Sequence, residues 1–328
     1  MTLGRLRIRV RPQLILPFVL AGALLAVALS LGDLSRVLGR VGLIPTSVLV
    51  FVLALALVYC LLKLGQFYLL LANLGLHPDR RRLLAAFAVG ELTLTLPFGV
   101  FAQNWLLTVT GTDTRFGHSS AATLVMLLTE TLVVLVWLAV AGIPHWPPLR
   151  PVAAVVALGV VLFVPVALAL QGSLTRYCPG PRYRRVRRML SSLSDLLAGC
   201  KQLARPCMLG LNIFMAAAYL GALAWAFTSV GQAVGLTGLD YRTAASIYAF
   251  SLAVVLLGGG ALSQIGTVEV LGMGAAQAFG YGLTDGLALM LAFRLVWTGA
   301  IWLINLPVVV VLWRSLRRPR SAASTDRV

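Results

Sequence analysis

Long apolar runs dominate the chain and are separated by short polar or basic stretches. Six of these runs are long enough to cross a bilayer as a helix, which takes about 20 apolar residues. The pattern therefore predicts an all-α polytopic membrane protein in which residues 1–328 form a single integral membrane domain. The six predicted spans lie near residues 12–31, 45–71, 119–142, 151–171, 207–230 and 287–313.

Two further apolar segments are interrupted where a spanning helix is continuous. Proline removes a backbone donor and glycine runs weaken a helix, and non-helical backbone at membrane depth persists only where protein or a water-filled cavity surrounds it. The segments lie near residues 84–110 and 244–281, and each is expected to fold as a broken or re-entrant helical hairpin. The interrupting residues are Glu91, Pro97, Gly99, Gln103 and Asn104 in the first segment, and Gly258, Gly259, Gly260, Gly266 and Glu269 in the second.

The distribution of arginine and lysine decides how these two segments run. Cytoplasmic loops carry an excess of basic residues. If both segments cross the membrane once, 14 basic residues fall on the cytoplasmic side and 11 outside. If both are re-entrant hairpins, 21 fall in the cytoplasm and four outside. We therefore expect hairpins that enter from opposite faces, with both termini cytoplasmic; the alternative is a pair of kinked ordinary spans whose glycines permit close packing.

Opposed interrupted segments in two halves indicate an inverted repeat. In transporters, such pairs mark a substrate site near the bilayer midplane. The first half, 12–171, contains the hairpin near 84–110, and the second half, 207–313, contains the hairpin near 244–281. The sequence thus predicts about six full spans and two hairpins that meet in the middle of the membrane.

The basic loop between the halves, 172–206, holds eight Lys and Arg residues. Its apolar residues recur at three- and four-residue steps, which is typical of an amphipathic helix. We expect this helix to lie on the inner leaflet, with its apolar face among acyl chains and its arginines on anionic headgroups. The tail, 314–328, is read as a basic cytoplasmic orientation signal. The arginines that start the helix are Arg184, Arg185, Arg187 and Arg188.

Composition excludes several classes of function. The chain is 59% hydrophobic and 11% charged with a net charge of +17, but its basic residues sit at segment ends without interleaved aromatic residues, so nucleic acid is not an expected partner. The four cysteines form no CxxC pair and the three histidines no HExxH motif, so neither a metal site nor a cofactor is expected. Because no catalytic motif is recognisable, we do not expect an enzyme.

Five ionisable residues fall within apolar segments, where each costs about 2.5–3.5 kcal/mol on insertion scales and so suggests a function. Glu269 and Arg294 are spaced to form an ion pair, which either orients Arg294 toward a phosphate or locks two helices together. Lys63 can partner Glu91 and Glu130, or it can extend to the cytoplasmic interface while Glu91 sits near that interface.

The amides of Gln103 and Asn104 follow Pro97 closely in the sequence. They can donate either to the backbone freed by Pro97 or to a headgroup, and we expect the backbone to be their partner. Together with the ionisable residues and Gly266, they complete the predicted substrate path: Lys63, Glu91, Pro97, Gln103, Asn104, Glu130, Gly266, Glu269 and Arg294.

The hairpin residues carry a resemblance to a known family. The run from Leu262 to Glu269, with Ala292, Phe293, Arg294 and Leu295 after it, resembles the Pro-x-Gly-Gly-Leu-Gly-x-x-Glu segment and later arginine of the lysylphosphatidylglycerol synthase membrane domain, or flippase-like domain. Leu96, Pro97 and Glu130 look like that family's Leu-Pro and mid-helix glutamate. The match covers nearly the whole chain in length and segment order, but its motifs are short.

The chain departs from the family pattern in both halves. The family's Gly-Glu and arginine after the first proline are replaced by Phe101, Ala102 and Trp105, and its second-half proline and paired glycines by Leu262, Ser263 and Gln264. The headgroup handled here is therefore expected to differ. The resemblance is to an integral membrane branch without the soluble transferase domain, so lipid aminoacylation by this chain is not expected.

What the resemblance implies is flippase-like translocation of a lipid or lipid-linked glycan headgroup between leaflets. The expected partners are membrane lipids, anionic or carrying a sugar, in a bacterial cytoplasmic membrane, with a homo-oligomer or an envelope enzyme as further partners to consider. Two alternatives stay open: a non-transporting lipid-binding accessory protein of an envelope enzyme, and an integral-membrane transferase that uses Glu91 or Glu269 as a base.

Overall fold

The computed structural model describes residues 39–40, 42–110, 115–142, 146–176, 184–258 and 264–316. These ranges are helical and contain no strand, which confirms the all-α class. The elements are α3 (Thr46–Asn73), α4 (Arg80–Thr93), η1 (Gly99–Phe101), α5 (Ala102–Thr110), α6 (Phe116–Ala141), α7 (Leu149–Arg176), α8 (Arg184–Leu203), α9 (Pro206–Ala233), α10 (Tyr241–Leu257), α11 (Thr267–Ala278) and α12 (Leu283–Leu316).

Four of the described helices, α3, α6, α9 and α12, are long and apolar enough to cross a membrane. They coincide with four of the six predicted spans, and they make the chain an integral membrane protein. The predicted span 12–31 lies outside the described residues. The predicted span 151–171 falls on α7, in which the apolar stretch with described side chains is Leu149–Leu162. A total of six spans therefore stays a prediction.

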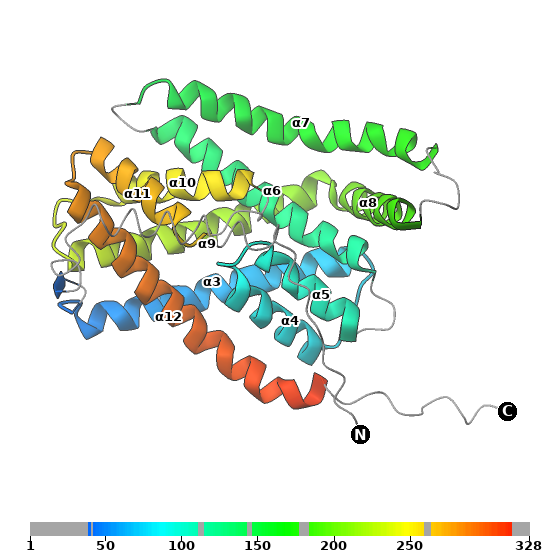
Figure 1. Cartoon of the computed structure of the whole chain (residues 1–328), viewed down its shortest axis with the longest axis horizontal. Coiled ribbons are helices and arrows are strands. Elements are labelled where there is room, and N and C mark those ends of the chain that lie inside the picture. Colours follow the sequence, from blue (N-terminus) through cyan, green and yellow to red (C-terminus); the bar gives the residue numbers. More distant parts are fainter. Residues whose placement is uncertain are drawn as a thin grey trace.

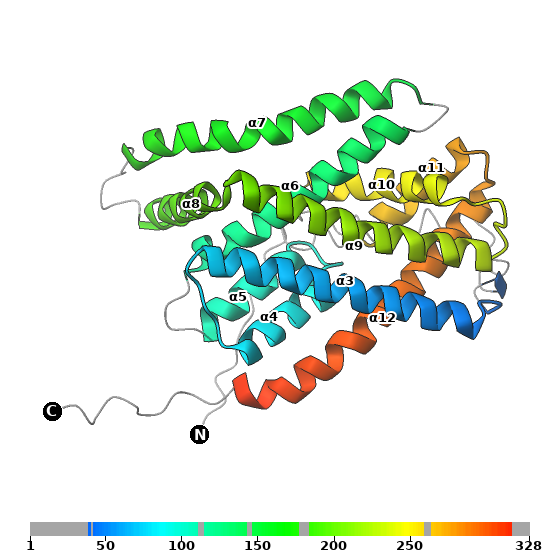
Figure 2. The same cartoon turned by 180° about the vertical axis from the view of Figure 1, so that it is seen from behind.

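Helix α3 lies on one face of the bundle and packs against α9 and α12 (Figures 1 and 2). Its buried face carries Tyr59, Lys63 and Phe67, whereas Phe51 and Leu61 on its other face are exposed. Exposed large apolar side chains are also frequent on α9 and α12, as expected of surfaces that contact lipid tails. The polar side chains of α3 are thus directed away from the lipid-facing surface.

The first interrupted segment folds as α4 and α5, which pack side by side at one end of the bundle (Figure 1). The chain reverses after α4, where Phe98 follows Pro97 with a positive φ of 57°. Gly99 then packs so closely on the end of α4 that a Cβ there would overlap the carbonyl oxygen of Thr93. The Thr93 hydroxyl also donates to the Gly99 carbonyl oxygen at 3.0 Å, so this reversal is tightly built.

The second interrupted segment folds as α10 and α11 at the opposite end of the bundle (Figures 1 and 2). Asp240 caps α10 by accepting from the Thr243 backbone N–H at 2.7 Å, and this bond lowers the pKa of the exposed Asp240 carboxyl. The two reversals meet inside the bundle, where the Gln264 backbone N–H donates to the Thr95 carbonyl oxygen at 3.2 Å. Segments about 170 residues apart in sequence are therefore joined through their backbones.

Helix α8 corrects one part of the sequence interpretation. A helix was expected over this basic loop and is present, but Leu197, Cys200 and Leu203 are buried in the protein rather than among acyl chains. The Gln202 side chain also donates to the Asn73 carbonyl oxygen at 2.6 Å, at the end of α3. The side chains of the arginines at the start of α8 (Arg184, Arg185, Arg187 and Arg188) lie outside the described residues, so their contact with headgroups stays a prediction.

Replacing Gly99 by Ala tests how tightly the first reversal is built. The added methyl overlaps backbone rather than a mobile side chain, so we expect Gly99→Ala to cost at least about 2 kcal/mol of stability. The matched control is Gly159→Ala on α7, where a Cβ meets nothing within 4 Å. In detergent, thermal unfolding should show Gly99→Ala melting about 5 °C or more below wild type and Gly159→Ala melting at or above it. Equal melting temperatures for the two variants would contradict the packing at Gly99.

Candidate functional site

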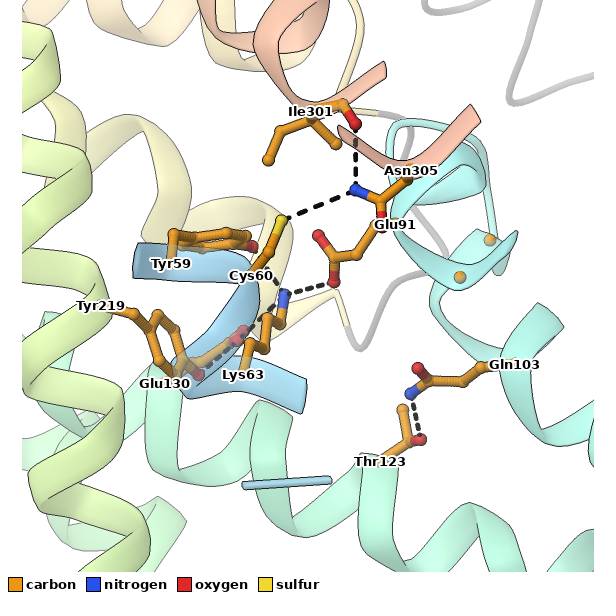
Figure 3. A network of polar contacts seen from close by, with 12 residues as sticks. Tyr59, Cys60, Lys63, Glu91, Gln103, Thr123, Glu130, Tyr219, Ile301 and Asn305 are labelled. Carbon is orange, nitrogen blue, oxygen red and sulfur yellow. Dashed lines mark hydrogen bonds and ion pairs between the residues drawn. The ribbon is translucent and has the colours of Figure 1, made fainter. Parts of the chain in front are cut away.

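A buried charged cluster joins four helices in the middle of the bundle (Figure 3). The Lys63 ammonium on α3 lies 3.3 Å from Oε1 of Glu91 on α4 and 3.4 Å from Oε1 of Glu130 on α6. It also donates to the Tyr59 hydroxyl at 2.8 Å, while the Tyr219 hydroxyl on α9 donates to Glu130 Oε1 at 2.6 Å. We call these five residues the Lys63 cluster. The sequence interpretation that kept Lys63, Glu91 and Glu130 together in the interior is thereby confirmed.

The Lys63 cluster is shielded from the surrounding lipid and from bulk water. Lys63, Glu91 and Glu130 are 5%, 6% and 7% exposed, so none of them extends to a membrane interface. The rings of Tyr59 and Tyr219 face the ammonium at 5.0 and 5.9 Å, distances at which the faces of aromatic rings stabilise a cation. A charge removed from solvent costs several kcal/mol unless it is paired, so these contacts fix how α3, α4 and α6 pack together.

A second ion pair lies on the other interrupted segment. Arg294 Nε on α12 donates to Glu269 Oε1 on α11 at 2.6 Å, which confirms the pair expected from the sequence. The other carboxylate oxygen of Glu269 accepts from the Gly266 backbone N–H at 2.7 Å, as N3 glutamates do in a capping box. Gly266 adopts a positive φ of 83°, which glycine tolerates without strain. The backbone of the second reversal thus orients the Glu269–Arg294 pair.

Arg294 is also held by the loop at the second reversal. Its Nη2 donates to the Gln264 carbonyl oxygen at 3.1 Å, and its Nη1 lies 3.5 Å from the Gln264 side-chain oxygen. The Arg294 side chain stays 22% exposed, whereas the Glu269 side chain is 2% exposed. The guanidinium is therefore held in place on one side and reachable on the other.

One cavity joins the Lys63 cluster to the Glu269–Arg294 pair, and we call it the central cavity. Its volume is about 80 Å³, enough for a few water molecules and smaller than the roughly 300–1,000 Å³ of ligand pockets. Its remaining lining is mostly apolar and aromatic. The charged residues that line the cavity are Lys63, Glu91, Glu130, Glu269 and Arg294.

Packed aromatic rings form part of the central cavity lining. Tyr59 meets Trp297 edge-to-face at a centroid distance of 5.3 Å, and Phe293 stacks on Trp297 at 5.7 Å. Phe293 in turn meets Tyr248 of α10 at 5.4 Å. Such pairs contribute about 0.5–1.5 kcal/mol each beyond their buried area. The cavity that contains both charged groups is therefore lined in part by a rigid set of aromatic side chains.

Four of the predicted path residues, Pro97, Gln103, Asn104 and Gly266, do not line the central cavity. Gln103 and Asn104 both donate to the Thr123 hydroxyl on α6, at 2.8 and 2.7 Å, so the expectation that they would bond to the backbone freed by Pro97 is wrong. Their amides instead attach α5 to α6. Pro97 is half-buried at the first reversal and shapes the turn without lining the cavity.

Sequence reasoning missed the partners of the charged residues. Tyr59 lies four residues before Lys63 on α3, a spacing that places two side chains on one helix face and could have identified it. Tyr219 and Gln264 come from distant segments, and no local pattern in the sequence marks them.

Comparison with known proteins leaves the family resemblance untested. The chain matches no protein-family model, and no characterised protein is significantly similar to it in sequence. What the site does must therefore be argued from its own geometry.

Replacing Lys63 tests whether its ammonium holds the cluster together. Lys63→Ala leaves two buried carboxylates without their shared partner, so we expect a loss of about 3 kcal/mol in stability and a clearly lower melting temperature. The matched control is Lys201→Ala, which removes an exposed lysine in the last turn of α8. Thermal unfolding of the two purified variants checks this expectation, and a Lys63→Ala protein as stable as the control would contradict it.

Proposed function

We propose that the protein translocates the polar headgroup of a lipid or lipid-linked glycan between the leaflets of a bacterial cytoplasmic membrane. In this proposal the two interrupted segments are re-entrant hairpins that enter from opposite faces. The observation that carries it is the central cavity, where the two interrupted segments meet and where all five ionisable residues of the apolar segments converge.

Arg294 is the residue best placed to contact an anionic headgroup. Its guanidinium keeps one edge on Glu269 while Nη1 and Nη2 contact only Gln264 among the described residues. A phosphate oxygen that displaced the Gln264 contacts would gain charge-assisted hydrogen bonds, which are roughly twice as strong as neutral ones. Because Glu269 stays fixed by the Gly266 N–H, the arginine would remain oriented during this exchange.

The lipid tails would stay outside the bundle during transfer. Leu96 of the first reversal and Trp302 of α12 both line the central cavity, yet they are 38% and 51% exposed on the apolar surface. This edge gives a headgroup lateral access from the bilayer while its acyl chains remain in lipid. The central cavity must widen to admit a headgroup. The Gln264–Thr95 backbone hydrogen bond would break during this widening, which costs about 1 kcal/mol for that bond.

The narrowness of the cavity favours one alternative function. A volume of about 80 Å³ also suits a protein that binds a lipid at its surface and positions an envelope enzyme, without any headgroup passing through. The two functions differ in what Arg294 does, because only translocation requires its guanidinium to meet a headgroup inside the central cavity.

Removing the Arg294 guanidinium tests translocation directly. The probe is acyl-labelled fluorescent phosphatidylglycerol in phosphatidylcholine vesicles, with transfer read as the fraction of label protected from a membrane-impermeant quencher. We expect wild type to accelerate transfer and Arg294→Ala to slow it about 10- to 100-fold, since a charge-assisted contact contributes about 1.5–3 kcal/mol. Arg242→Ala, which removes an exposed arginine at the start of α10, should transfer at the wild-type rate.

A double variant separates transport from stability. In Glu269→Gln/Arg294→Ala neither charge of the pair remains, so folding should recover relative to the single variant while transfer stays slow. Wild-type transfer by this double variant would show that the pair only locks helices together. If the transfer rate with wild-type protein does not exceed the rate in protein-free vesicles, either for this probe or for a fluorescent lipid-linked sugar, the accessory function would be favoured.

Cysteine labelling tests the opposed hairpins. Arg115, which follows α5, and Gly238, which precedes α10, are both exposed, so single cysteines there should react readily once Cys178 and Cys207 are replaced by Ser. In the re-entrant topology, a membrane-impermeant reagent labels Arg115→Cys from the cytoplasmic side and Gly238→Cys from the outside. Labelling of Arg115→Cys only from outside would rule out the first hairpin.

A further inference from the structure

The charges that line the central cavity do not balance. Glu269 is matched by Arg294, but Lys63 faces two carboxylates, Glu91 and Glu130. With every group ionised, the described lining carries three negative charges and two positive ones. The excess negative charge lies in the Lys63 cluster, whose ionisable side chains are nearly fully buried. An uncompensated charge in such surroundings costs several kcal/mol.

The excess negative charge can be assigned to one oxygen atom of Glu91. Its Oε1 lies beside the Lys63 ammonium, whereas its Oε2 is buried and has no hydrogen-bond partner among the described residues. Both oxygens of Glu269, in contrast, accept hydrogen bonds. Burying a carboxylate oxygen without a hydrogen-bond donor costs its full desolvation free energy. A proton on Oε2 removes that cost and leaves Oε1 free to accept from Lys63.

Among the described residues, the groups facing Glu91 offer no other compensating charge. Helices α5 and α12 pack around α4 and carry the neutral amides Gln103 and Asn305 near the cluster. The α12 cation Arg294 is already paired with Glu269. The titratable side chains that act on Glu91 come from α3, α6 and α9, and they are Tyr59, Cys60, Lys63, Glu130 and Tyr219.

We propose that the Lys63 cluster is a proton-binding site that holds one proton between Glu91 and Glu130, with Oε2 of Glu91 as the atom that carries it. The proton comes from water in the central cavity, an O–H bond forms at Oε2, and the same bond breaks when the proton returns to water. No electron transfer or co-reactant is needed. With this proton bound, the described lining of the cavity is electrically neutral.

The proton site also suggests how the cavity treats an anionic headgroup, and this step rests on the proposed function. A phosphate at Arg294 adds negative charge to a cavity that already holds three carboxylates. A proton on the Lys63 cluster lowers the repulsion, so proton and headgroup bind more tightly together than either does alone. Transfer of an anionic headgroup would then be coupled to movement of a proton in the same direction.

Infrared spectroscopy tests the proton site without requiring transport. The measurement is the carbonyl stretching band of protonated carboxylic acid, recorded for the full-length protein in lipid at about pH 7. Wild type should show a band equal to one buried carboxylic acid. Glu91→Gln and Glu130→Gln should each abolish it, because one carboxylate and one ammonium then remain and balance. Glu269→Gln, a matched buried glutamate already paired with Arg294, should leave the band in place.

Lys63→Met gives a result that a merely structural cluster does not predict. Without the ammonium, both Glu91 and Glu130 must be neutralised, so the band should about double relative to wild type. The proposal is overturned if wild type shows no band at this pH, or if the band survives in Glu91→Gln. Melting curves of Glu91→Gln and Glu130→Gln show whether a lost band reflects an unfolded protein. If only one of these variants folds, the presence or absence of the band in that variant tests the proton site.

Vesicle transport separates this proposal from the proposed function. With fluorescent phosphatidylglycerol as probe, a gradient of one pH unit across the vesicle membrane should change the wild-type transfer rate several-fold. The transfer rate of Glu91→Gln should be the same with and without this gradient. A protein with the carboxylic acid band but no lipid transfer keeps the proton site and loses the translocase proposal. A protein that transfers lipid without the band keeps translocation and loses the proton site.

Discussion

The sharing of one buried ammonium by two carboxylates is the interaction on which the arrangement of the first half depends. Lys63, Glu91 and Glu130 belong to three different helices, and no membrane interface is available to any of them. In hydrocarbon, a helix that shifted enough to separate these groups would leave charges unpaired at a cost of several kcal/mol. The cluster therefore fixes the depths of α3, α4 and α6 relative to one another, which apolar packing alone does not specify.

In the second half, the buried glutamate has a full set of charge and hydrogen-bond partners. This difference between the halves determines how charge is distributed around the central cavity. Glu269 has a cation for one oxygen and a backbone N–H for the other, so this pair is rigid and fully satisfied. The Lys63 cluster has one cation for two carboxylates, and Oε2 of Glu91 has no hydrogen-bond partner among the residues that the structure describes. An arginine oriented by a rigid ion pair thus lines the same cavity as a cluster whose charges do not balance.

Hydrophobic pattern and charge predicted much of this fold. Four apolar runs became long helices, and both interrupted segments broke near Pro97 and Gly266, because proline and a glycine with positive φ cannot continue a helix. The ion pairs could be foreseen because unpaired charges are costly in lipid. The hydroxyl and amide partners could not, since Tyr219, Thr123 and Gln264 meet their partners only through tertiary packing. The burial of the α8 apolar face was missed because periodicity shows that a face is apolar but not what covers it.

The energetics of opening favour the hairpin tips as the moving parts. The tips are joined by one described backbone hydrogen bond, whereas each hairpin is anchored by buried ion pairs, by α5–α6 amide contacts or by close packing at Gly99. Breaking this hydrogen bond costs about 1 kcal/mol, whereas separating either charged group costs several times more. Motion that widens the central cavity would therefore keep Glu269 on Arg294 and Lys63 on its carboxylates. The charged groups travel with their helices, and only the contacts to Gln264 and Thr95 need to exchange.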